Sequence, residues 1–131
     1  MENANLIIPI AMCRLNLQMI QDYLGVPFAQ EPSALMGRLN ELSSLLGTSA
    51  QTMSSIKFIA LDAVGLATQE AFRLKYPPSM AKAYAEGKCA EIIANSELAN
   101  RQNAAITHQI EAVRSILSFT KQELYHSNTQ R

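Results

Sequence analysis

Apolar and small residues recur at alternating intervals of four and three over the last third of the chain. This heptad stripe starts at Ala85 and continues for more than five heptads without a proline, through Cys89, Ile92, Ser96, Ala99, Asn103, Ile106, Ile110, Val113, Leu117, Thr120 and Leu124. It predicts a long amphipathic helix over residues 80–125. Such a helix would be about 68 Å long, whereas a compact domain of 131 residues has a radius of gyration of only about 14 Å. The helix must therefore break near residues 95–103 or pack against a partner.

Two arrangements satisfy this stripe, and both bury the same face. In the first, the chain kinks around residues 95–96 or 100–103, where core positions are small or polar, and folds into a four- or five-helix bundle. In the second, the stripe forms an oligomeric coiled coil in which Asn103 pairs with its symmetry mate and selects register and strand number. The residues predicted to form that oligomer interface are Ile92, Ala99, Asn103, Ile106, Ile110, Val113, Leu117 and Leu124.

Three shorter helices are expected upstream of the stripe, over residues 9–24, 33–46 and 50–74. Pro9 suits the first turn of a helix, and Gly25 suits the position just after its end. Ser33 is a candidate N-cap for the second helix, which Gly47 is expected to end. The predicted fold is all-α: a single helical domain over residues 1–131, in which three to four antiparallel helices form a bundle with a long C-terminal, coiled-coil-like helix.

Composition and charge restrict the class of protein. Lys plus Arg and Asp plus Glu each number 11, and 48% of the residues are hydrophobic. This balance excludes a disordered charged tail and argues against binding of duplex DNA through a cationic surface. No apolar run reaches the ~20 residues of a membrane helix, and the start of the chain lacks the cationic region of a secretory signal. Cys13 and Cys89 are expected to be buried and reduced, so we expect a cytoplasmic protein without membrane contact.

Motifs that carry catalysis or bind metals are scarce. The sequence contains no glycine-rich phosphate loop, no Cys-x-x-Cys and no Gly-x-Ser-x-Gly turn. His108 and Glu111 share one helical face, but His108 falls at an outer heptad position that is typical of a solvated side chain. We therefore expect that the protein is not an enzyme and holds no cofactor or metal.

A small cluster mixes basic and aromatic residues on both sides of the Pro77-Pro78 turn. Aromatic faces beside cations are typical of surfaces that hold single-stranded nucleic acid. The alternative is that the tyrosines pack at a helix junction while the basic residues keep it soluble. The residues of this cluster are Arg73, Lys75, Tyr76, Lys82 and Tyr84.

Arg114 and Lys121 occupy the e column beside the heptad stripe, together with Asn100 and Thr107. Charges at e positions select partners across a helix interface. The column is therefore a candidate contact for a phosphate-bearing ligand at an oligomer interface. The alternative is that Arg114 pairs with Glu123, at a g position, of a neighbouring copy.

The segment over residues 100–124 carries the run His-Gln-Ile-Glu-Ala-Val-Arg-Ser-Ile-Leu-Ser, followed by Lys and Glu. It resembles the closing helix of small helical proteins that bacteriophages and prophages encode, and the resemblance covers about a fifth of the chain. Such proteins generally lack an assigned activity, and some lie near recombination genes. The resemblance implies phage origin, a helical fold and a non-catalytic role, which would place the protein in the host cytoplasm.

These observations lead to one main functional hypothesis and one alternative. The main hypothesis is a non-enzymatic, self-associating helical protein of phage type, a dimer or higher oligomer. It would assist DNA replication or recombination by binding single-stranded nucleic acid or another protein. The alternative is a phage-encoded inhibitor of a host defence system that binds a host protein or sequesters a nucleotide signal.

Overall fold

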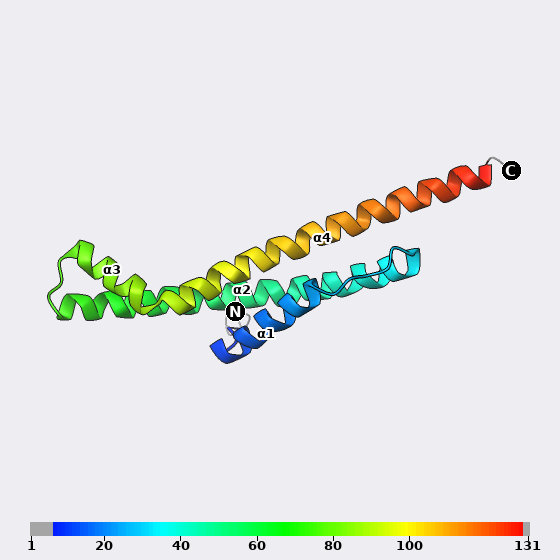
Figure 1. The fold of residues 1–131 in the computed structure, drawn as a ribbon. Coiled ribbons are helices and arrows are strands. Elements are labelled where there is room, and N and C mark those ends of the chain that lie inside the picture. The colour runs from blue at the N-terminus through cyan, green and yellow to red at the C-terminus, as the bar shows by residue number, and fades with distance from the viewer. Residues whose placement is uncertain (1–6, 130–131) are drawn as a thin grey trace, which may run out of the picture.

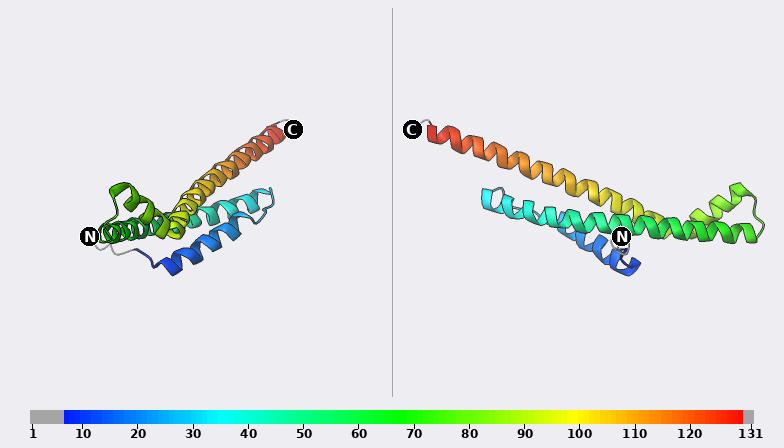
Figure 2. Two further views of the ribbon diagram at one scale, coloured as in Figure 1. Left: turned by 60° about the vertical axis from the view of Figure 1, so that its left-hand side comes forward. Right: turned by 180° about the vertical axis from the view of Figure 1, so that it is seen from behind.

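The computed structural model describes residues 7–129, and all regular secondary structure in this span is helical (Figure 1). The helices are α1 (Ile10–Leu24), α2 (Pro32–Arg73), α3 (Pro78–Lys88) and α4 (Ala90–Thr129). The long helices α2 and α4 run antiparallel, α1 packs beside both of them, and α3 folds back along the end of α2 (Figures 1 and 2). The predicted all-α bundle with a long C-terminal helix is confirmed.

Helix α2 continues through Gly47, so the predicted boundary between helices over 33–46 and 50–74 is wrong. The cause is a second heptad stripe that keeps its phase across the glycine. Its buried members are Leu35, Arg38, Leu42, Leu45, Ser49, Thr52 and Ile56. Only an unbroken helix places all of them on one face. No glycine of residues 7–129 has the positive φ of a helix-ending glycine, and the Thr52 hydroxyl donates within the helix to the Thr48 carbonyl at 2.8 Å.

The C-terminal helical region is interrupted at Cys89, which corrects both the continuous helix predicted over 80–125 and the break predicted near 95–103. Cys89 has φ −104° and ψ 17°, and it follows closely on Gly87, a weak helix former. Residues 95–103 remain helical. Asn103 Nδ2 donates to Ser49 Oγ on α2 at 3.2 Å, so this polar core position has a polar partner and the helix can pass straight through.

The apolar core consists of three clusters distributed along the molecule. The largest lies where the end of α1, the first half of α2 and the second half of α4 meet; its buried members are Ile20, Leu35, Leu42, Leu45, Ile106, Ile110, Val113 and Leu117. The second contains Cys13, Leu17, Ile56 and Ala99. The third contains only Ala67, Ala85 and Cys89, and these small residues allow α3 to approach α2 and α4 closely.

Polar contacts lie between the first two clusters and fix the register of three helices. Asn16 on α1 donates to Thr52 Oγ1 on α2 at 3.0 Å. Gln102 on α4 is 3% exposed, and its Nε2 donates to the Leu17 carbonyl at 2.8 Å. Because displacing one helix along another would leave these buried polar groups unpaired, the contacts select one register.

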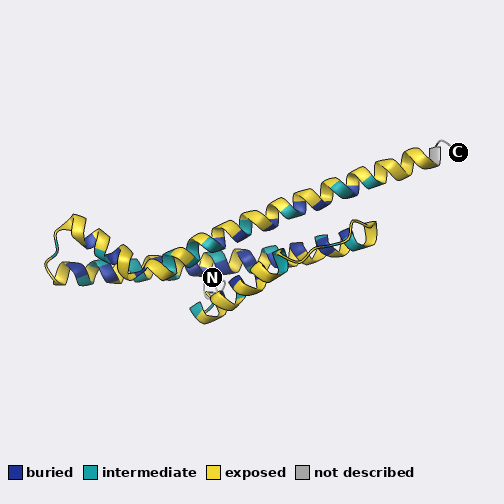
Figure 3. Cartoon of the chain, in the orientation of Figure 1, coloured by how far each residue is buried: buried dark blue, intermediate teal, exposed yellow. Residues whose placement is uncertain are grey.

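Most residues predicted to form an oligomer interface are covered by helices of the same chain. Ala99, Ile106, Ile110, Val113 and Leu117 are buried, and Ile92 and Asn103 are half-buried. Leu124 is 56% exposed, because α4 extends past its partners and its last turns face solvent (Figure 3). Seven of the eight residues therefore contribute to the internal packing of the bundle, and a second copy could reach them only if the bundle opened.

The two cysteines are buried free thiols in different clusters. Burial raises the pKa of the Cys13 thiol, and this effect outweighs that of a backbone hydrogen bond.

Within residues 7–129, the helices are too short or too polar to cross a membrane.

Candidate functional site

The basic and aromatic cluster predicted from the sequence lies at the corner between α2 and α3. Arg73 ends α2, Tyr76 lies in the turn, and Lys82 and Tyr84 belong to α3. Lys75 forms the turn with a φ of 65°. The rings of Tyr76 and Tyr84 pack against each other with centroids 5.4 Å apart. The structure thus places these five residues around one helix junction, where the two rings contact each other and Lys82 lies 4.0 Å from Glu86 on its own helix.

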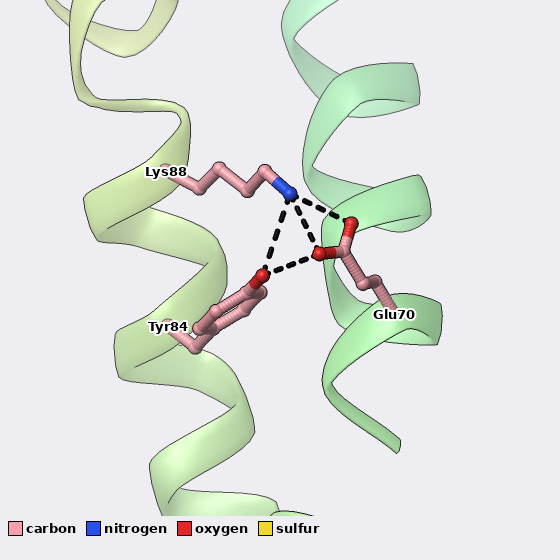
Figure 4. A network of polar contacts seen from close by, with 3 residues as sticks. All are labelled: Glu70, Tyr84 and Lys88. Atoms are coloured by element: carbon pink, nitrogen blue, oxygen red, sulfur yellow. Dashed lines mark hydrogen bonds and ion pairs between the residues drawn. The ribbon is translucent and has the colours of Figure 1, made fainter. Parts of the chain in front are cut away.

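Glu70 and Lys88 complete this corner, although neither belongs to the cluster predicted from the sequence. Glu70 Oε1 accepts from the Tyr84 hydroxyl at 2.5 Å and from Lys88 Nζ at 2.7 Å (Figure 4). These two hydrogen bonds lower the pKa of Glu70, and the bond to Glu70 is the main reason that the pKa of Lys88 is raised. The spacing of Tyr84 and Lys88, four residues apart on one helix, was the available signal. The network joins α2 to α3, and its Glu70–Lys88 ion pair adds no net charge to the predicted cationic surface.

Arg114 and Lys121 lie far from this corner. Both are exposed on the second half of α4, which ends at the opposite end of the molecule from α3 (Figure 1). They are therefore not part of the same surface as Arg73, Lys75 and Lys82.

Arg38 is a buried cation that was not among the residues predicted from the sequence. It occupies a core position of α2 and is 4% exposed. Its Nε donates to Gln109 Oε1 at 2.8 Å, and one terminal nitrogen donates to the Tyr23 carbonyl at 3.3 Å. The guanidinium carbon lies 4.1 Å from the centroid of the Tyr23 ring and 4.8 Å from that of Phe28. Arg38 thus holds the connection between α1 and α2 against α4.

The solvent side of the second half of α2 carries large apolar side chains. Phe58 is 57% exposed, Leu61 is 66% exposed and Phe72 is 53% exposed. With Gly65 and the half-buried Thr68 they follow the intervals three, four, three and four of a heptad stripe. We name these five residues the α2 outer seam. Its positions lie about 110° around the helix axis from the buried Ala60, Ala67 and Ala71. Of these three, Ala67 packs with Ala85 of α3.

The first helix also exposes apolar side chains, at Met12, Leu15 and Met19. This surface is shorter and contains no aromatic ring. Arg14 beside it is paired with Glu91 on α4 at 2.8 Å.

Residues 7–129 contain no group of three or more potential metal-ligating side chains. His108 Nδ1 and Glu111 Oε2 are 3.9 Å apart, and both side chains are largely exposed.

Comparisons of the chain with family models, curated proteins and solved structures found no match.

Proposed function

We propose that the protein is a non-enzymatic, self-associating helical binding protein. The observation that supports this function is the α2 outer seam, because large apolar residues at heptad spacing on a solvent-facing helix are typical of helix-pairing surfaces. The total accessible surface supports it as well. The chain exposes 8858 Å², whereas a compact monomer of 14.4 kDa is expected to expose about 6,800 Å².

Assistance in DNA replication or recombination, in the cytoplasm of a phage host, is the biological role that we propose for this binding protein. It rests on the resemblance of residues 100–124 to the closing helices of phage proteins. Between the two candidate ligand classes, the corner geometry favours a protein over single-stranded nucleic acid. Tyr76 and Tyr84 contact each other, and Tyr84 and Lys88 already bind Glu70 within the chain, so fewer groups are left to stack on bases or to pair with phosphates.

Sedimentation equilibrium of the full chain over a range of concentrations tests the proposed self-association. We expect an average mass that rises above 14.4 kDa with concentration. A mass that stays at the monomer value at the highest concentrations would contradict the proposal.

Fluorescence anisotropy of a labelled single-stranded oligonucleotide at low salt tests the choice of ligand class. We expect no increase at high protein concentration. An increase that Arg73→Glu abolishes and the matched Arg114→Glu control leaves intact would instead assign nucleic-acid binding to the corner.

A further inference from the structure

We propose that the α2 outer seam pairs with the same seam of a second copy, with the two α2 helices parallel and in register. This inference rests on the proposed self-association and specifies its surface and geometry.

The spacing of the seam matches a two-stranded coiled coil. Phe58, Gly65 and Phe72 fall at a positions, and Leu61 and Thr68 fall at d positions. Gly65 leaves room at the centre, because a Cβ added there would meet nothing within 4 Å apart from its chain neighbours and the backbone of its own helical turn. The Thr68 hydroxyl donates back to the Val64 carbonyl at 2.8 Å, so its hydrogen-bonding need is already met within the helix.

The charges beside the seam select a parallel pairing. Lys57 falls at the g position before Phe58, and Asp62 falls at the e position after Leu61. In a parallel coiled coil, a g residue lies close to the e residue five positions further along the partner helix. Each Lys57 would therefore meet Asp62 of the partner subunit, which gives two ion pairs per dimer. In an antiparallel pair, g residues face g residues and e residues face e residues, and this attraction is lost.

Both charges are available for such pairing. Lys57 and Asp62 are exposed, and neither takes part in an ion pair within the described part of the chain. Glu97 on α4 borders the same surface hollow as Lys57, but the two side chains form no ion pair, so a second copy would have none to break.

The surface of the whole chain leaves area that pairing can cover. The chain exposes about 2,000 Å² more than a compact monomer of its mass, whereas a standard interface covers about 800 Å² on each partner. Pairing along α2 would cover its apolar side chains and leave the internal packing of α1, α3 and α4 unchanged.

Charge reversal in the full chain, followed by sedimentation equilibrium at low salt, tests the pairing. We expect Lys57→Glu and Asp62→Lys each to weaken the dimer by about tenfold, because two attractive pairs become repulsive. The double variant should restore the wild-type affinity.

The apolar part of the seam is tested by Leu61→Asp, which should yield a monomer of unchanged helix content by circular dichroism. The matched exposed variant Leu15→Asp on α1 should still dimerise.

Crosslinking tests the direction and register. In a parallel, in-register pair, Leu61→Cys brings its two thiols together, so mild oxidation should yield a disulfide-linked dimer. Leu15→Cys and the wild-type chain, whose own cysteines are buried, should remain uncrosslinked.

The outcomes separate the two proposals. A wild-type chain that is monomeric at every concentration would overturn both the self-association and the seam. A dimer that persists in Leu61→Asp but dissociates in Leu15→Asp would retain self-association and overturn the seam. A dimer whose affinity does not respond to charge reversal, and that does not crosslink through Leu61→Cys, would overturn the parallel register.

Discussion

Arg38 shows how one side chain can decide the packing at a helix junction. Its guanidinium reaches Gln109 on α4, the Tyr23 carbonyl at the end of α1 and the ring of Phe28 in the connector. A lysine could not reproduce this arrangement, because an ammonium is a point charge whereas the guanidinium is planar, donates in several directions and stacks on rings.

We expect Arg38→Ala to lower the free energy of unfolding by about 3 kcal/mol, because two hydrogen bonds of a charged group and buried packing are lost. Arg38→Lys should recover less than half of this loss. Urea denaturation monitored by circular dichroism measures both. Arg114→Ala, at an exposed position of α4, is the control and should change the value by less than about 0.5 kcal/mol. Equal losses in the two alanine variants would contradict the role of Arg38.

Glu70 makes the stability depend on pH in a definite direction. Hydrogen bonds from Lys88 and Tyr84 lower its pKa in the folded chain. Its contribution is therefore complete above the pKa of a glutamate in the unfolded chain, about 4.3, and is lost as the pH falls through the lower folded value.

Glu70→Gln should therefore melt at a lower temperature than the wild type at pH 7. The difference should shrink below about pH 4.3 and disappear once Glu70 is protonated in the folded wild type. Calorimetry across this pH range measures it, with Glu97→Gln on α4 as the exposed control. A difference between wild type and Glu70→Gln that does not change with pH would show that the carboxylate charge has no part in it.

The two long helices show where sequence reasoning succeeds and where it fails. Heptad spacing in the last third of the chain predicts a helix, and α4 is present there, because burial of one face dominates helix formation in proteins. The same spacing runs across Gly47, but the glycine itself predicts a helix end there. A local stop signal of about 1 kcal/mol is weaker than burial of the residues on both sides.

Gly47→Ala tests that interpretation directly. In a continuous helix with open space at Gly47, alanine should raise the free energy of unfolding by about 0.5–1 kcal/mol. Gly37→Ala, in the same helix and equally open, should have a similar effect. Urea denaturation distinguishes a continuous helix from one that ends at Gly47. If Gly47 ended a helix with a positive φ, the Gly47→Ala variant would be less stable than the wild type.

The polar core positions and the site could not be derived from the sequence in the same way. Asn103 fits a bond to Ser49 in the same chain and an Asn pair between two chains equally well, because both satisfy the amide. Glu70 and Lys88 are 18 residues apart, so only the fold at the Pro77-Pro78 corner brings them together. The α2 outer seam was missed because it shares α2 with a stronger, buried stripe.

The two ends of the α4 stripe should respond differently to truncation. Ile106 is fully buried, whereas Leu124 is 56% exposed. Ile106→Ala should lower the free energy of unfolding by about 3 kcal/mol, and Leu124→Ala should change it by less than about 0.5 kcal/mol. Similar losses at both positions in urea denaturation would mean that a second copy covers the whole stripe.

At the scale of the whole molecule, α2 has two apolar faces with different partners. The inner face packs on α1, α3 and α4 and completes the bundle, and the outer seam faces solvent. The inner stripe of α2 therefore stabilises the fold, and the α2 outer seam is the surface for association. Both assignments require that the heptad stripe of α4 be covered by helices of the same chain.

Pulsed electron paramagnetic resonance between spin labels at Ser44 on α2 and His108 on α4, in a chain with both native cysteines replaced, tests that requirement most directly. Both positions are exposed and lie near the level of the Asn103–Ser49 bond. We expect a defined distance below about 30 Å, since packed helix axes lie 8–10 Å apart, and it should persist when the labelled chain is refolded with a tenfold excess of unlabelled chain. Loss of that distance on dilution would show that α4 packs against another copy.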